Sequence, residues 1–130
     1  MAINKMSKMI SKKNPWQGEI WLVNFKQIKE TRKPHRPCLT LSNNQQNIYD
    51  YEVIILPLTT EEVIKGEIQP FEIPIEVSQE TGLDEPSRIL TNRIHTIDKE
   101  LHLIKKLGRV SQEIWQKLLN SLWVVITGQK

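Results

Sequence analysis

The sequence predicts a mainly β protein, a compact antiparallel sheet or small barrel followed by one C-terminal helix. Two observations carry this prediction. Short runs rich in β-branched and aromatic residues recur at close spacing, with polar turn sequences between them, which is typical of antiparallel sheets and small barrels. After residue 110, apolar residues repeat every four positions instead, the spacing of one helix face.

The first two predicted strands flank a polar loop. A turn-like segment at residues 14–18 leads into GEIWLVNF (18–25), the first strand. Residues 26–35 are polar, contain proline and lack strand alternation, so they form a loop. The second strand, RPCLTLS (36–42), has Pro37 near its start, where a missing donor is tolerated, and ends in a polar cluster.

Four further segments are predicted to be strands. YEVIILPLTT (51–60) holds four consecutive apolar residues, as expected for a strand buried on both faces. Residues 71–77 alternate with a period of two, and Pro74 there predicts an edge strand or a bulge. After the turn sequence TGLDEP, we expect one strand over residues 87–97 and a short last one over 105–110.

The C-terminal segment has the signals of a helix. Ser111 is a suitable N-cap and Glu113 lies in the first turn, where an acid is favourable. The four-residue repeat is Ile114, Leu118, Leu122 and Ile126, and Trp115, Leu119, Trp123 and Val125 widen the apolar stripe. The wide stripe indicates either a second partner surface, such as that of a symmetric homodimer, or a broader cover over the sheet.

Length and composition fit one domain in a reducing compartment. The 130 residues suit a single core, with residues 1–14 as a basic flexible tail and 15–130 as the domain. No apolar run approaches the ~18 residues of a spanning helix, and the N-terminus lacks the apolar region of a secretory signal. A lone Cys38, read as a small strand residue, fits the cytoplasm. The net charge of +3 only weakly favours a polyanionic partner.

The common enzyme signatures are missing from the sequence. There is no phosphate-binding glycine loop, HExxH helix, CxxC pair or GxSxG motif. His35, His95 and His102 lie far apart without an acid or cysteine at ligand spacing, which argues against a zinc site. Any catalysis would therefore use arginine, histidine, threonine or carboxylate groups, with no metal and no cofactor.

A family resemblance rests on motifs along nearly the whole chain after the tail. In order, GEIWLVNF, HRPCLTLS, LPLTT, PFEIPIEV, GLDEPSRIL and IHTIDKEL, with a closing helix, resemble the MazF/PemK toxins in order and spacing. The resemblance implies a small SH3-like antiparallel barrel with a C-terminal α-helix. It also implies a dimeric toxin of a toxin–antitoxin pair that cleaves single-stranded RNA at short sequences.

The resemblance assigns two catalytic positions. The arginine of the family's Arg-Pro pair falls on Arg36, and its threonine falls on Thr59. In metal-free cleavage the 2′-hydroxyl attacks the adjacent phosphorus, and negative charge builds on the phosphoryl oxygens. A guanidinium offers paired donors to those oxygens, and a threonine hydroxyl can donate to a non-bridging oxygen.

The acid and base are less well defined. His35 adjoins Arg36 and suits proton transfer near neutral pH, but neighbours on a strand point to opposite faces unless the loop end bends. Glu30 matches a loop glutamate of the family and is the candidate base. It lies six residues before Arg36 where five are expected, and Arg32-Lys33-Pro34 replaces the usual glycines.

The expected RNA contacts and partners complete the prediction. The RNA-binding candidates are Arg32, Lys33, Thr60 and Arg93. Because Arg93, preceded by Asn92, stands where the family commonly has Gln after an acid, the cleavage specificity is expected to differ. Trp16 or Phe71 could stack bases. We expect a cognate antitoxin whose acidic segment lies across the RNA groove.

Two rival functions stay open at this point. One is a toxin like the related CcdB proteins, which poisons DNA gyrase by binding protein, and the other is a catalytically silent barrel that only binds nucleic acid. Arg36 together with Thr59 favours a sequence-specific endoribonuclease of mRNA that leaves a 2′,3′-cyclic phosphate and a 5′-hydroxyl.

Overall fold

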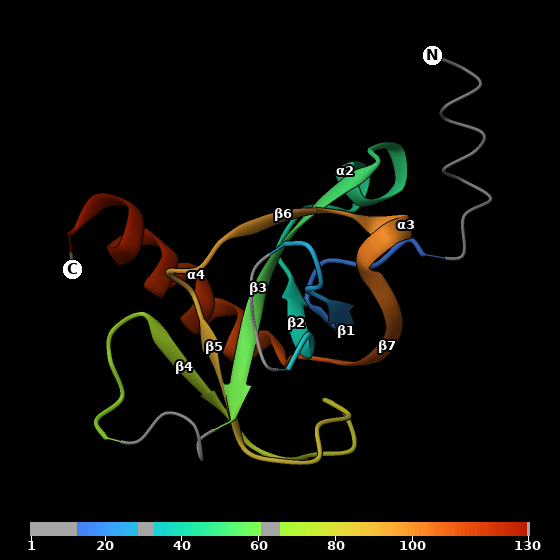
Figure 1. Ribbon diagram of the computed structural model, residues 1–130. Helices are drawn as coiled ribbons and strands as arrows, with labels where there is room; N and C mark the ends of the chain where they lie inside the picture. Colours follow the sequence, from blue (N-terminus) through green and yellow to red (C-terminus); the bar gives the residue numbers. More distant parts are fainter. Residues whose placement is uncertain (1–12, 29–32, 61–65, 130) are drawn as a thin grey trace.

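The computed structural model describes residues 13–28, 33–60 and 66–129 (Figure 1). The strands are β1 (Glu19–Asn24), β2 (His35–Thr40), β3 (Glu52–Thr60), β4 (Glu72–Ile75), β5 (Ser87–Leu90), β6 (His95–Asp98) and β7 (Leu103–Arg109). The helices are α2 (Asn44–Tyr49), α3 (Lys99–His102) and α4 (Gln112–Thr127). The predicted mainly β fold with a C-terminal helix is confirmed.

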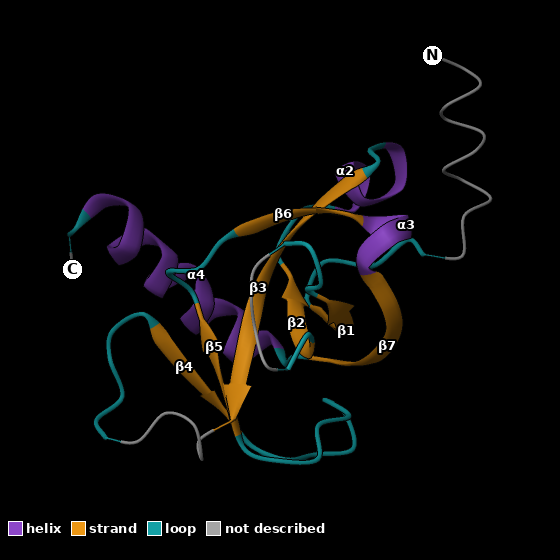
Figure 2. Cartoon of the chain, viewed as in Figure 1, coloured by secondary structure: helices purple, strands orange, loops and turns teal. Residues whose placement is uncertain are grey.

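All seven strands belong to one antiparallel sheet. Its order is β4-β5-β3-β2-β1-β7, and β6 pairs with β3 beside β5. Figure 2 shows α2 and α3 at one end of the sheet and α4 along the side formed by β4 and β5. Among the described residues the two outer strands, β4 and β7, do not pair with each other, so the sheet is not closed into a complete barrel.

The segment predicted as one strand over residues 87–97 is two strands. β6 pairs with β3 at Glu52 to Ile55, whereas β5 pairs with β3 at Leu58 to Thr60. Between them the chain turns, and Thr91 leaves the β3 ladder to bond Phe71 O through its N–H and its hydroxyl, both at 2.8 Å. Because of this break, one edge of β3 pairs with both β5 and β6.

The two faces of the sheet hold separate apolar cores. The first core lies between the sheet and α4 and includes Ile20, Leu39, Leu56, Ile89, Leu118 and Leu122. The second lies on the opposite face and includes Trp21, Val23, Phe25, Cys38, Val53, Ile55, Ile97 and Leu103. Because β3 contributes to both cores, its run of apolar residues is buried on both faces, as predicted.

The caps of α4 agree with the sequence. The Ser111 side chain accepts from Ile114 N at 3.2 Å, and Gly128 ends the helix in the left-handed conformation with φ 71°. Leu118 and Leu122 are buried, and Ile114 and Trp115 pack against the same core. Leu119, Trp123 and Ile126 remain exposed. The wide apolar stripe therefore has two parts. Trp115 belongs to the part that packs on the core, and a narrower part faces solvent.

Two short helices were not predicted. The polar residues 42–47 read as a strand end and loop, yet Asn43 caps α2 by accepting from Gln46 N at 2.8 Å. Asp98 caps α3 in the same way, accepting from Leu101 N at 3.0 Å. Such single-turn helices depend on caps rather than on apolar periodicity. For the Pro74 strand the sequence predicted an edge strand or a bulge. Among the described residues β4 pairs with β5 and with no second strand, so it is an edge strand.

The end of the predicted tail is attached to the domain. Residues 1–12 lie outside the described residues, but Lys13 Nζ donates to Glu100 O at 2.8 Å. Asn14 Oδ1 accepts from the buried Lys99 Nζ at 2.6 Å. In the described part of the chain, no helix is long and apolar enough to cross a membrane.

Candidate active site

Strand pairing places Arg36 and Thr59 on one face of the sheet. The β2–β3 register pairs Cys38 with Pro57, and Arg36 and Thr59 each lie two residues beyond this pair on their own strands. Both belong to the face that carries the second core, because strand residues two apart share a face. Both side chains are half-buried at the edge of that core. The core residues pack beneath them, and a ligand can still reach them.

Phe25 gives Arg36 a fixed support. The ring of Phe25 is fully buried, and its backbone N–H donates to Pro34 O at 2.6 Å just before β2. The Arg36 guanidinium lies over this ring, with Cζ 5.7 Å from the ring centroid. A cation stacked on an aromatic face keeps its donors at the edge of its own plane, which suits contacts with phosphate oxygens.

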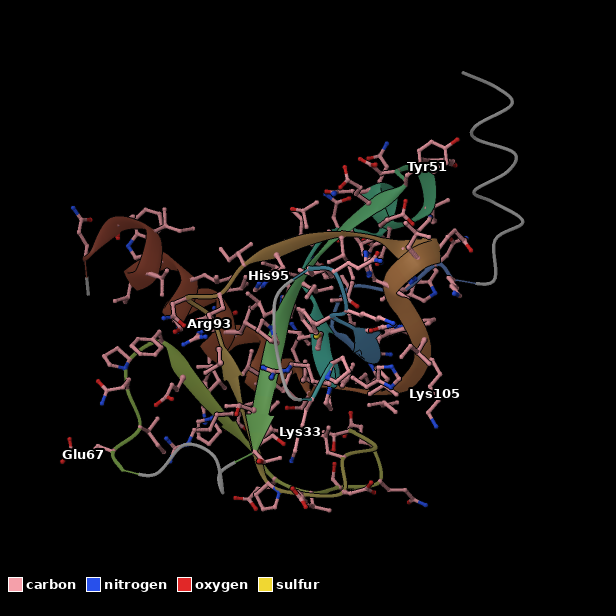
Figure 3. The ribbon with its side chains drawn as sticks, viewed as in Figure 1. Lys33, Tyr51, Glu67, Arg93, His95 and Lys105 are labelled. Carbon is pink, nitrogen blue, oxygen red and sulfur yellow. The ribbon has the colours of Figure 1, made fainter. Side chains whose placement is uncertain are left out.

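His95 approaches the same ring from β6. Its partner on β3 is Ile55, so it shares the face of Arg36 and Thr59. The His95 and Phe25 rings meet edge to face, with centroids 5.6 Å apart and an interplanar angle of 82°. Nδ1 of His95 lies 3.1 Å from Arg93 O. Figure 3 shows His95 and Arg93 on the β5–β6 side of β3.

The sequence analysis did not assign His95 to the site. When residues 87–97 are predicted as one strand, nothing in the sequence shows which residue of another strand lies beside His95. The alternation in β6 carries a usable signal, since Ile97 is buried and His95 is two residues away on the same face. The missing information was which residue of β3 it pairs with.

Two of the predicted residues lie on other faces. Within β2, His35 alternates with Arg36 and is exposed, so the strand does not bend to bring His35 beside Arg36. Thr60 pairs with Ser87 and alternates with Thr59, so it belongs to the α4 side of the sheet. For both residues strand alternation decides the placement, and sequence adjacency misleads.

The remaining candidates lie in or beside loops. Glu30 and Arg32 fall outside the described residues. Lys33 is exposed just before β2 and lies near the carboxyl end of β3 (Figure 3). Trp16 is exposed, but it precedes β1, whereas Arg36 pairs with Val23 near the other end of that strand. Trp16 is therefore far from Arg36.

Cys38 is a core residue below the site. Its side chain is fully buried, and Sγ lies 3.6 Å from Arg36 O. Burial raises the pKa of the Cys38 thiol well above its ordinary value, and the nearby charge of Arg36 offsets this only in part. The structure thus agrees with the interpretation of Cys38 as a strand residue rather than a nucleophile.

Carboxylate, histidine and cysteine side chains do not gather into a metal-ligand set in the described parts of the chain. The Arg36 guanidinium and the Thr59 hydroxyl belong to the same face of the sheet. The arrangement can thus offer paired N–H donors, a hydroxyl and an imidazole from three different strands.

The comparisons with known proteins identify the family of this chain. The family described as PemK-like, MazF-like toxin of type II toxin-antitoxin system matches residues 16–126. The chain belongs to this family of toxins. No curated protein matches the chain.

Solved structures show the same fold. An endoribonuclease from Mycobacterial species, in complex with its cognate antitoxin, superposes with a TM-score of 0.69 at 21% identity, covering 89% of this chain and 98% of that one. The Mycobacterium tuberculosis toxin MazF-mt6 gives 0.68 at 19% identity, covering 83% and 95%. MazF from Deinococcus radiodurans gives 0.69 at 18% identity, covering 88% and 97%.

Proposed function

We propose that this toxin is a sequence-specific, metal-independent endoribonuclease that cuts single-stranded mRNA in the cytoplasm. The observation that carries the proposal is that the half-buried side chains of Arg36 and Thr59 share one face of the sheet, each two residues from the Cys38–Pro57 pair. Structures of the same fold that are named endoribonucleases support the choice of reaction.

Arg36 would stabilise the charge that develops on phosphorus. As the 2′-oxygen attacks, the two non-bridging oxygens gain negative charge, and a guanidinium held on Phe25 can donate two parallel hydrogen bonds to them. Because the ring fixes the guanidinium before the substrate binds, little reorganisation is needed during the reaction.

Thr59 would complete this set of donors. Its hydroxyl comes from the neighbouring strand, and a hydroxyl can donate to one phosphoryl oxygen while Arg36 holds the other. Arg93 and Lys33, both exposed, would bind flanking phosphates. Such contacts add affinity without base specificity. Specificity then depends on unstacked bases, which only a single strand offers.

A cognate antitoxin is the expected protein partner. The family is defined by toxin–antitoxin pairs, and the related mycobacterial endoribonuclease was solved with its antitoxin. An acidic antitoxin segment over Arg36, Arg93 and Lys33 would compete with RNA by carrying the same sign of charge.

The proposed function predicts that RNA is cut and DNA of the same sequence is not. The protein should cleave a single-stranded RNA pool at a restricted set of short sequences, because bases are read individually. The matched DNA pool should stay intact, because it lacks the 2′-hydroxyl nucleophile. Sequencing the new ends in both pools measures both outcomes.

The rival functions give other results in the same assay. A toxin that poisons gyrase would cleave neither pool but would stall gyrase on plasmid DNA. A silent nucleic-acid-binding protein would retain RNA on a filter without cutting it. Either result would contradict the nuclease.

A second proposal concerns assembly through α4. Leu119, Trp123 and Ile126 follow one exposed stripe, with Trp123 59% exposed. Ile94, also exposed, lies in the β5–β6 turn, which the 2.9 Å hydrogen bond between the Thr91 and Ser121 hydroxyls ties to α4. An exposed apolar stripe on α4 favours a partner, and the commonest is a second copy of the chain.

We therefore expect a homodimer that Trp123→Glu weakens at least tenfold, because the substitution places a charge in the apolar interface. Light scattering at micromolar concentration measures the change. Trp16→Glu is the matched control, since Trp16 is also about half exposed (52%) but lies off α4. A wild-type monomer, or equal effects of the two substitutions, would rule out this interface.

A further inference from the structure

His95 is held on the reactive face by two independent contacts. Its ring packs edge to face on Phe25, an arrangement that aromatic pairs prefer. Its Nδ1 lies at hydrogen-bond distance, 3.1 Å, from the backbone carbonyl of Arg93. A half-buried ring with both contacts has one orientation relative to the sheet.

The contact with Arg93 determines which nitrogen can react. A carbonyl oxygen only accepts, so Nδ1 carries a proton and donates it. Nε2 is then the nitrogen that can exchange a proton with a bound substrate.

His95 and Arg36 both contact the ring of Phe25. The guanidinium carbon and the imidazole centroid lie 5.7 and 5.6 Å from the centroid of the same ring. Both side chains thus contact one ring on the same face of the sheet, so one bound RNA strand can reach both.

We propose that His95, through Nε2, is the general acid that protonates the leaving 5′-oxygen, an inference that rests on the proposed ribonuclease function. In this step the 2′-oxygen forms its bond to phosphorus, the bond from phosphorus to the 5′-oxygen breaks, and the Nε2 proton passes to that oxygen. The 2′-hydroxyl proton passes to a base, which solvent water can supply. His95 takes the acid role in place of His35, which faces away from Arg36.

The test uses a substrate that needs no acid. Two RNA oligonucleotides contain one mapped cleavage site, one with the natural 5′-oxygen and one with a 5′-bridging sulfur. A thiolate leaves without protonation. His95→Ala should slow single-turnover cleavage of the oxygen substrate at least about 10²-fold and should cleave the sulfur substrate at nearly the wild-type rate.

Three further variants make the result specific. His95→Phe keeps an aromatic ring against Phe25 and should behave like His95→Ala, which separates proton transfer from packing. Arg36→Lys should stay slow on both substrates, because it acts on the phosphoryl oxygens. His102→Ala should match the wild type on both, since that ring contacts Asn24 O at 2.9 Å on β1.

The possible negative results distinguish the acid role of His95 from the proposed nuclease function. Equal slowing of both His95 variants on both substrates, or wild-type rates on the oxygen substrate, would overturn the acid role while leaving the nuclease intact. Absence of cleavage by the wild-type protein on either substrate would overturn the proposed function itself.

Discussion

Arg36→Lys should slow single-turnover RNA cleavage about 10²-fold, the scale of losing one preorganised donor, while RNA affinity changes little. Lysine keeps the charge but not the forked, planar donors that the guanidinium holds over Phe25. If the paired contacts tighten as the phosphorane forms, the loss must fall on the chemical step rather than on binding.

Lys33→Ala is the matched control for this prediction. Lys33 is exposed beside the start of β2, so it should contribute mainly long-range attraction to RNA. Its loss should weaken binding and flatten the salt dependence, with the saturated rate largely intact. Wild-type cleavage by Arg36→Lys at saturating RNA would reduce Arg36 to a phosphate contact.

Lys99→Met should lower the free energy of unfolding by about 3 kcal/mol. Lys99 is 1% exposed, and its Nζ donates to Asn47 O at 2.6 Å and Ile48 O at 3.3 Å, the terminal carbonyls of α2. It also donates to Asn14 Oδ1 in the N-terminal segment. Methionine fills similar space but leaves these buried acceptors without their donor.

The measurement is urea unfolding at a fixed protein concentration, because dimer formation would shift the midpoint. Lys105→Met on the exposed surface of β7, labelled in Figure 3, should change stability by less than about 0.5 kcal/mol. Equal midpoints for the two variants would show that the Lys99 contacts do not stabilise the fold.

The strands with strong apolar patterns could be predicted from the sequence. β1, β2 and β3 and the helix α4 combine a dominant periodicity with turn or capping residues at their ends, so local and tertiary preferences agree. α2 and α3 have no such pattern. Their formation depends on Asn43 and Asp98 as caps and on the burial of Lys99, which only the folded chain provides.

The placement of the candidate residues could be predicted only in part, for a related reason. Arg36 and Thr59 were predicted from a motif order, and strand alternation beyond the Cys38–Pro57 pair puts both on one face of the sheet. His35 was assigned from its neighbour in sequence, although alternation places it on the other face. His95 lies 59 positions from Arg36 along the chain, and only the pairing of β6 with β3 brings it to Phe25.

The most direct test of metal-free cleavage by Arg36 and Thr59 is the chemistry of the RNA ends formed in excess chelator. Attack by the 2′-hydroxyl predicts undiminished cleavage with a 2′,3′-cyclic phosphate on one fragment and a 5′-hydroxyl on the other. Mass spectrometry of a short cleaved oligonucleotide distinguishes these ends. A 5′-phosphate with a 3′-hydroxyl, or loss of cleavage in chelator, would contradict the mechanism.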